Sequence, residues 1–354
     1  MASTTDSGLA RNARHVEADM LGADFRCDSF DDIPFLLVVQ PGGPERSSRK
    51  FLTEWTQANM AMLEDLLIEF GAVLYRGFAI HGAEAFDEFC SIFPTFEMGY
   101  GAGVSPRQPI AGKVFESTRV PAPNKLIMHQ EMSYMQRYPA KLAFHCHVAP
   151  DSGGETIIGD MRRFTAALPD PIMRKLDDKG VTYRRNYLAP GTDDARTEWK
   201  FAHPDWAFAF YTDDRDEIEA ACRARGLDFE WRKDGSLSTA ITLPGTVRHP
   251  VTGDMLFFNQ LYAQTPHPRW MGKAMWEWFD KIYGDEWPLP IDATYGDGSP
   301  LEDDEFNAIY DGLDAVTRSF PWQPGDVLLL DNLLTGHGRN PYKGKRDVQV
   351  VLIG

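Results

Sequence analysis

The sequence has few cysteines and no long apolar run, and each absence excludes a class of protein. Its four cysteines show no CxxC or CxxxC spacing, which argues against a disulfide framework and a zinc ribbon. No apolar run is long enough to span a bilayer, and the segment from Met1 to Arg14 lacks the apolar core of a signal peptide. We therefore expect a cytoplasmic protein with free thiols and no membrane partner. The four cysteines are Cys27, Cys90, Cys146 and Cys222.

Clustered basic residues are also missing. The formal net charge is -16, and the longest basic runs are short pairs such as Arg162-Arg163 and Arg184-Arg185. A nucleic-acid-binding surface normally has a basic excess or a basic stripe, so the sequence argues against a nucleic-acid partner. The acidity itself does not identify a substrate.

The chain is long and apolar enough for a sizeable core, with 354 residues of which 43% are hydrophobic. Residues 1–20 are polar and without periodicity, and we expect a flexible N-terminal segment there. No repeat or low-complexity linker divides the remainder, so residues 21–354 are expected to form a single domain. Many short strands with a few helices favour a mainly β fold with helical insertions and a double-stranded β-helix (jelly roll, cupin-like) core.

Hydrophobic periodicity places the clearer elements. Glu54 to Phe70 has apolar residues at helical spacing and stops at Gly71. Pro171 to Lys179 is a second clear helix, with Asp170 as its expected N-cap. The remaining expectations are a helix around Ala83–Phe93, strands at Ala72–Phe78 and Leu142–Val148, a short strand that begins with Thr156–Ile158, and strands in the segments VLLLD and DVQVVLIG.

A histidine and a glutamate two residues apart, His129 and Glu131, form the first candidate metal motif. In extended backbone, residues i and i+2 point to the same side, so both side chains can reach one ion. His337, just beyond a strong strand, is the natural third ligand. Two histidines and one carboxylate form the facial triad of non-haem iron(II) oxygenases. A lone HxE is common by chance, however, and does not decide the matter.

The other histidines have weaker claims. His145 and His147 alternate along KLAFHCHVAP, where apolar neighbours favour core or sheet-face histidines over ligands. Five more lack a second ligand type at useful spacing and are expected to be structural or on the surface: His15, His81, His203, His249 and His267.

A basic residue, Arg346, follows His337 by nine positions. A guanidinium there could bind the far carboxylate of a dicarboxylic cosubstrate through a bidentate fork. By position alone, an ordinary surface arginine is the better interpretation.

Two long stretches decide between these interpretations: NKLIMHQEMSYMQRYPAKLAFHCHVAPDSGGETIIGDMRRFTAALP, and the region from YGDGSPLEDDEFNAIYDGL to FPWQPGDVLLLDNLLTGHGRNPYKGKRDV. They resemble the TauD/TfdA-like branch of the 2-oxoglutarate-dependent dioxygenases, in particular its SyrP-like and clavaminate-synthase-like enzymes. The resemblance spans residues 60–354. It implies iron on His129, Glu131 and His337, and 2-oxoglutarate on Arg346 with the Thr156 hydroxyl as a second contact.

Two positions depart from the pattern of this family. Glu131 stands where many relatives have aspartate, and a retained carboxylate argues against halogenation, because family halogenases have a small residue there. Val350 stands where sulfonate-oxidising members have another arginine, which disfavours taurine-like sulfonates. Arg339 is a candidate contact to cosubstrate or substrate, with a salt bridge to Asp331 as the equal alternative. Further candidates to line the pocket, or to bond the surrounding backbone, are Asn124, Gln130, Ser133 and Tyr134.

The resemblance implies an iron(II)-, 2-oxoglutarate- and O2-dependent dioxygenase that hydroxylates an aliphatic C–H bond. The expected substrate is a small polar molecule, an amino acid or derivative in natural-product biosynthesis. Desaturation, cyclisation and a carrier-tethered substrate remain open, although the acidity of the chain leans toward a free substrate. A zinc hydrolase is a remote alternative, because the HExxH pattern is absent. A homo-oligomer also remains open.

Overall fold

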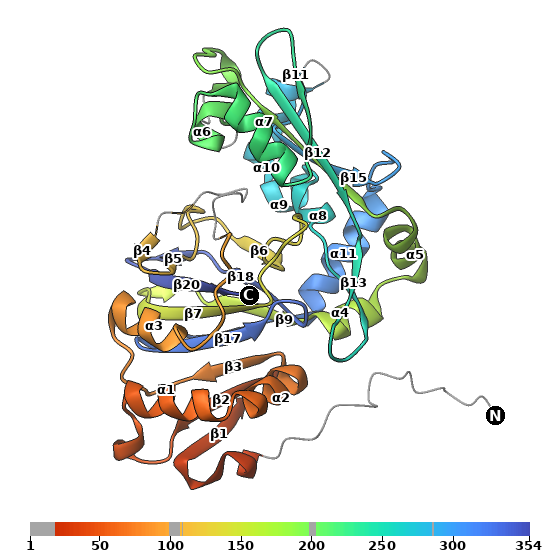
Figure 1. The fold of residues 1–354 in the computed structure, drawn as a ribbon. Helices are drawn as coiled ribbons and strands as arrows, with labels where there is room; N and C mark the ends of the chain where they lie inside the picture. The colour runs from red at the N-terminus through yellow and green to blue at the C-terminus, as the bar shows by residue number, and fades with distance from the viewer. Residues whose placement is uncertain (1–17, 99–106, 108, 198–202, 285–286) are drawn as a thin grey trace, which may run out of the picture.

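The computed structural model describes residues 18–98, 107, 109–197, 203–284 and 287–354 (Figure 1). Its largest element is an eight-stranded sheet in which β2 and β3 are parallel and the other neighbours are antiparallel. In sheet order the strands are β1 (Phe25–Phe30), β2 (Ile33–Pro41), β3 (Ala72–Tyr75), β17 (Val327–Asp331), β7 (Lys141–Val148), β20 (Asp347–Ile353), β5 (Val114–Glu116) and β4 (Pro109–Ala111).

A four-stranded antiparallel sheet packs against one face of the larger sheet. Buried Leu142, Leu328 and Val350 of the larger sheet share a core with Ile158 and Phe320 of the smaller one. This two-sheet sandwich is the jelly-roll core expected from the sequence, and both candidate histidine ligands lie on its smaller sheet. In order, the smaller sheet contains β16 (Thr317–Phe320), β9 (Thr156–Asp160), β18 (Thr335–Arg339) and β6 (Leu126–His129).

Three helices cover the other face of the larger sheet (Figure 1). They are α1 (Arg49–Ala58), α2 (Met60–Phe70) and α3 (Gly82–Cys90). The single helix expected from Glu54 to Phe70 is therefore wrong. The chain breaks at Asn59, whose side-chain amide donates to the Trp55 carbonyl at 2.8 Å, because asparagine competes with the helix for backbone partners.

The helical insertions form a second lobe beside the jelly roll (Figure 1). This lobe contains a four-stranded sheet, whose strands in order are β11 (Asp228–Trp231), β12 (Leu237–Leu243), β10 (Val181–Tyr187) and β15 (Ile291–Tyr295). Its helices are α4 (Met161–Ala167), α5 (Asp170–Lys179), α6 (Trp206–Phe210), α7 (Arg215–Ala224), α8 (Leu261–Gln264), α9 (Pro268–Met271), α10 (Lys273–Tyr283) and α11 (Asp303–Val316). Short elements complete the fold: η1 (Ala18–Asp24), η2 (Pro44–Arg46), η3 (Ala195–Thr197), β8 (Ser152–Gly153), β13 (Thr246–Arg248), β14 (Met255–Phe257) and β19 (Tyr342–Lys343).

Several boundaries differ slightly from the sequence expectations. The strand expected to end at Phe78 ends at Tyr75, and α5 begins at Asp170 with Pro169 as its N-cap. Of the segment expected to be flexible, residues 1–17 lie outside the described part of the chain, and residues 18–20 open η1. Among the described residues no helix has the length and apolar character needed to cross a membrane.

Candidate metal centre and adjoining pockets

Two histidines meet across neighbouring strands of the smaller sheet. His129 is the last residue of β6, and His337 lies at the middle of β18. Their Cα atoms are partners in the antiparallel register, and their ring centroids are 4.6 Å apart. The strand pairing therefore brings together two side chains that are 208 positions apart in the sequence.

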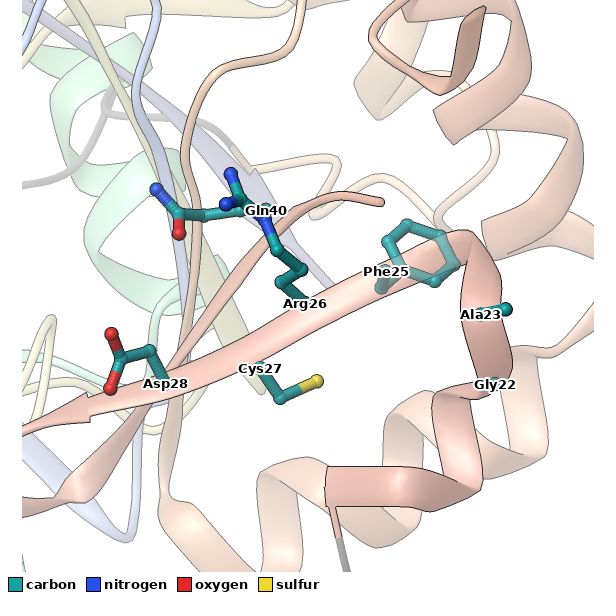
Figure 2. Close-up of a pocket in the computed structure, with 7 residues that line it drawn as sticks. All are labelled: Gly22, Ala23, Phe25, Arg26, Cys27, Asp28 and Gln40. Carbon is teal, nitrogen blue, oxygen red and sulfur yellow. The ribbon is translucent and has the colours of Figure 1, made fainter. Parts of the chain in front are cut away.

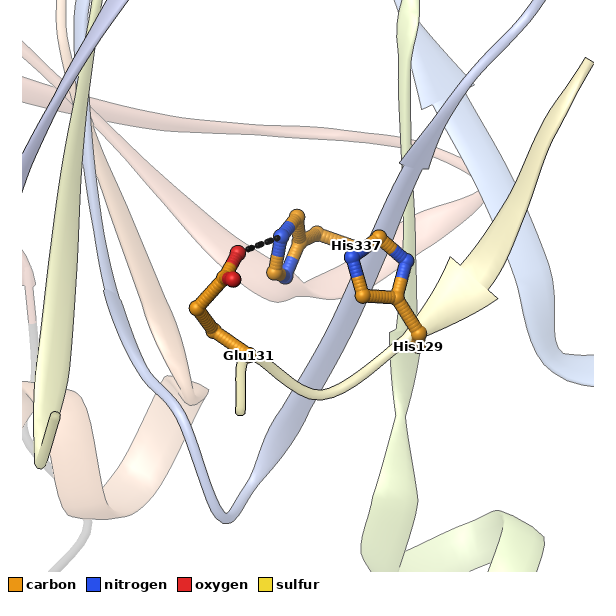
Figure 3. Close-up of side chains that lie close together, drawn as sticks. All are labelled: His129, Glu131 and His337. Carbon is orange, nitrogen blue, oxygen red and sulfur yellow. Dashed lines mark ion pairs between the residues drawn. The ribbon is translucent and has the colours of Figure 1, made fainter. Parts of the chain in front are cut away.

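Glu131 joins the two histidines from the turn that follows β6 (Figure 3). Its Oε2 lies 3.5 Å from the His337 Nε2, and the three side chains offer ligand atoms within 4.8 Å of one another. The fully buried Asn332 fixes this turn, because its Oδ1 accepts from the Glu131 N–H at 2.8 Å and its Nδ2 donates to the Glu131 carbonyl at 2.9 Å. The backbone position of the carboxylate is therefore set from both sides.

The protonation of these groups suits a metal ligand set. Burial, with the nearby His337, lowers the pKa of His129 to about 4, so this imidazole is neutral at neutral pH. Burial by itself raises the pKa of Glu131, but the hydrogen bond from His337 and the charge of Arg107 outweigh it and bring the pKa to about 2. A neutral imidazole and an ionised carboxylate are the forms that bind a divalent ion.

The hydrogen bonds around the two histidines also suit metal binding. The His129 Nδ1 lies 2.9 Å from the Ile127 carbonyl, which can only accept, so Nδ1 carries the proton and Nε2 keeps its lone pair. In the described part of the chain the buried His337 Nδ1 has no hydrogen-bond partner. Two imidazoles and a carboxylate that converge in this way fit an iron(II) ion with open positions for other ligands.

A small pocket adjoins both histidines and contains three residues named from the sequence: Arg346, Thr156 and Arg339. The Arg346 Nε donates to the Gly154 carbonyl at 2.9 Å, which leaves the terminal nitrogens for a ligand. Burial and the neighbouring positive charge of Arg339 lower the pKa of Arg346 to about 10. The pocket thus offers a fork-shaped cation beside the candidate metal ligands.

The glycine turn before Thr156 allows this arrangement. Gly154 has a φ of 71°, and a Cβ there would lie 2.9 Å from the Tyr342 Cβ and 3.1 Å from the Arg346 Cδ. Only glycine therefore lets the arginine pack on this carbonyl. Thr156 itself is buried, and its Oγ1 accepts from the Trp322 indole at 3.0 Å.

Arg339 has a different partner from the salt bridge weighed from the sequence. Its terminal nitrogens donate to the carbonyls of Val120 at 2.8 Å, Pro121 at 2.9 Å and Asn124. In the described structure Asp331 instead pairs with His249 at 3.4 Å. Arg339 therefore holds the segment before β6 against the pocket.

A second, larger cavity of about 680 Å³ adjoins the triad and is lined by His129 and Glu131. Of the residues proposed to flank it, Asn124 and Tyr134 line it. The side chains of Gln130 and Ser133 instead bond buried backbone carbonyls.

Sequence reasoning missed Arg107, which lines both the small pocket and the large cavity. Its positive charge helps to lower the pKa of Glu131 and of His129. It stands alone in a Gly- and Pro-rich stretch with no motif around it, so no sequence signal marked it.

The other described histidines lie outside the triad, and two of them, His81 and His147, are exposed. His145 is fully buried, lies within hydrogen-bond distance of the Gln349 side chain and the Ile80 carbonyl, and stacks on Phe86. His15 lies outside the described residues. A separate hollow at β1 and β2 is lined by Arg26, Asp28 and Gln40 among others and contains no member of the triad (Figure 2).

Comparison with known proteins identifies the family. A sequence model of the taurine catabolism dioxygenase TauD, TfdA family matches residues 40–352. The chain belongs to the TauD/TfdA family. The enzyme class expected from the resemblance is thereby confirmed: this family member is a non-haem iron, 2-oxoglutarate-dependent dioxygenase.

Relatives of this TauD/TfdA dioxygenase cover nearly its whole length. The dapdiamide synthesis protein DdaC of Enterobacter agglomerans is 33% identical over 82% of this chain and 84% of its own. A clavaminate synthase-like protein of Arabidopsis thaliana is 29% identical over 90% of this chain and 93% of its own. The fold resembles PvcB, an iron- and α-ketoglutarate-dependent oxygenase from an isonitrile synthetic pathway, with a TM-score of 0.51 and 16% identity over 93% of this chain and 92% of that one.

Proposed function

We propose that this dioxygenase hydroxylates an unactivated aliphatic C–H bond of a small, free, amino-acid-like molecule in the cytoplasm. The observation that carries the proposal is the convergence of His129, Glu131 and His337 between a cationic pocket and a large cavity. With iron(II) and 2-oxoglutarate bound, such a site uses O2 to oxidise a C–H bond while 2-oxoglutarate becomes succinate and carbon dioxide. The relative DdaC is named for dapdiamide synthesis, which supports a role in natural-product synthesis.

Each side chain has one part in this proposal. His129, Glu131 and His337 hold iron(II), and burial with the nearby charges sets the ionisation states of His129 and Glu131 before the metal arrives. Arg346 binds the far carboxylate of 2-oxoglutarate through its two terminal nitrogens, and Thr156 adds a neutral hydroxyl contact. Arg339 acts indirectly, because it fixes the carbonyls of the segment before β6, which lines the larger cavity.

The substrate occupies the larger cavity, which is lined by His129 and Glu131 and shares His129 with the cosubstrate pocket. Enclosure there holds the target carbon near the metal and keeps bulk water away from the reaction. Hydroxylation and desaturation would use the same protein ligands, so the product decides between them.

A substrate screen tests the proposal. Purified enzyme loaded with iron(II) is incubated with 2-oxoglutarate, O2 and each of a panel of free amino acids and their derivatives, and succinate is measured. We expect at least one compound to raise succinate release and to gain one oxygen atom by mass spectrometry, while the His337→Ala enzyme gives neither. A product that loses two hydrogens without gaining oxygen would replace hydroxylation by desaturation. Succinate release that persists in His337→Ala would contradict the proposed ligands.

A further inference from the structure

A chain of three glutamines connects the candidate metal site to the wall of the large cavity. The first, Gln130, lies between His129 and Glu131, and its backbone carbonyl accepts from the Gln260 Nε2 at 2.9 Å. The Gln260 Oε1 in turn accepts from the Gln264 Nε2 at 3.3 Å. Gln260 and Gln264 are one helical turn apart at α8, and both line the cavity that Glu131 lines.

Elementary chemistry decides which group donates and which accepts in each hydrogen bond of this glutamine series. A backbone carbonyl can only accept, so Gln260 must turn its NH2 toward Gln130 and its oxygen toward Gln264. Gln264 must then donate its NH2 to Gln260, so its Oε1 is the terminal acceptor of the series. This oxygen is buried and has no hydrogen-bond partner in the part of the chain that the structure describes, and only 6% of Gln264 is exposed.

An unpaired buried acceptor is unfavourable, and a ligand that supplies an N–H donor relieves it. The terminal torsion of a glutamine is soft, so the oxygen can adjust toward such a donor. A substrate group that can only accept hydrogen bonds, such as an ester or ether oxygen, is unfavourable at this point, because two acceptors would then face each other.

Apolar side chains of α9 and α10 form part of the wall of this cavity, to which Arg269 of α9 also contributes. Trp270, Met271, Met275 and Phe279 of α9, α10 and their junction line it. The Trp270 indole N–H already donates to the Thr265 carbonyl at 2.9 Å, so this ring offers only its apolar surface. A cavity of about 680 Å³ is also within the size range that encloses drug-sized ligands and exceeds the needs of a lone small amino acid.

We infer that the substrate carries an amide or ammonium N–H that binds the Gln264 Oε1, joined to an apolar group that packs against α9 and α10. This deepens the proposed function and rests on it for taking the cavity as the substrate site. A substrate held at Gln264 is tied through two amides to the peptide between two proposed metal ligands. Gln264 is thus a substrate-binding residue, and Gln260 is a positioning residue that orients it.

Three probes of matched shape test the inference: N-(2-phenylethyl)acetamide, its N-methyl derivative, and the ester 2-phenylethyl acetate. Their dissociation constants are measured by anaerobic calorimetry on the enzyme loaded with iron(II) and 2-oxoglutarate. We expect the secondary amide to bind wild type about ten- to hundred-fold more tightly than the ester or the N-methyl amide, because only it can donate to Gln264.

Three variants separate the parts of the inference. Gln264→Leu should remove the preference for the amide, whereas Gln57→Leu, at an exposed glutamine of α1, should keep it. Trp270→Ala should weaken the amide and the ester equally, because it removes apolar surface and no hydrogen bond to either probe. A thermal melt of each variant verifies folding.

The wild-type probe comparison does not depend on any variant folding. If the ester binds as tightly as the amide, or if the amide does not bind, the inference is wrong. Binding of iron(II) and 2-oxoglutarate, measured beforehand on the same sample, is independent of these probes. Its loss would contradict the proposed function instead.

Discussion

Replacing Arg346 with lysine should raise the 2-oxoglutarate requirement without unfolding the protein. The arginine uses its Nε on the Gly154 carbonyl and keeps its terminal nitrogens for a carboxylate. Lysine keeps the charge but gives up the two-pronged geometry. Loss of one charge-assisted hydrogen bond costs about 1.5–3 kcal/mol, which corresponds to a roughly ten- to hundred-fold increase in the requirement. The assay is succinate formation as a function of 2-oxoglutarate concentration.

Thr156→Val provides the internal comparison. Loss of its neutral hydroxyl should cost about 0.5–1.5 kcal/mol of cosubstrate binding, less than the arginine change. Because the Thr156 Oγ1 also accepts from the Trp322 indole, the valine leaves a buried N–H unpaired and should lower the free energy of unfolding by about 1–3 kcal/mol. Arg174→Lys, at an exposed side chain, is the control. An unchanged requirement in Arg346→Lys would refute this reasoning and make Arg339 the first alternative.

Three further predictions concern the metal site and the core around it. His337→Ala should lose iron and turnover, whereas His145→Ala should retain iron and lose only stability, as metal analysis and a thermal melt would reveal; loss of iron in His145→Ala would overturn the assignment. Asn332→Leu removes the amide that holds the backbone of the triad carboxylate, and iron affinity should fall about ten- to hundred-fold by competition with a chelator. Asp326→Leu breaks the buried ion pair that this carboxylate makes at 2.7 Å. The free energy of unfolding, measured by urea denaturation, should fall by about 3–5 kcal/mol, and iron affinity should not change.

The parts of the fold with simple local patterns could be predicted from the sequence. The segments VLLLD and DVQVVLIG are mostly apolar because β17 and β20 lie inside the eight-stranded sheet, with buried side chains on both faces. The break at Asn59 could not be predicted from periodicity, because the apolar spacing continues through it while one side-chain hydrogen bond ends the helix. In the insertion lobe, the sheet order joins strands that are far apart in the sequence, which no local pattern encodes.

The candidate site also contains residues that the sequence could indicate and residues that it could not. His129 and Glu131 could be paired from their spacing. His337 and Arg346 are candidates by position, the family resemblance decides in their favour, and the structure places them beside the pair. Asn332 and Gln264 could not be assigned, since their roles depend on hydrogen bonds to residues far along the chain or reached through a second side chain. Arg339 shows the limit most plainly. Its sequence neighbours suggested Asp331 as a partner, but the fold gives it three backbone carbonyls more than 200 positions away.

The central claim is that this chain binds iron(II) through its triad and chelates 2-oxoglutarate there. The most direct measurement is the visible spectrum of the anaerobic enzyme during titration with iron(II) and 2-oxoglutarate. We expect the weak charge-transfer band of a keto acid chelated to iron(II) in wild type and its absence in His337→Ala. A wild-type enzyme that shows no such band and retains zinc tightly through purification, as a zinc hydrolase would, would contradict the assignment of iron(II) and 2-oxoglutarate to this site.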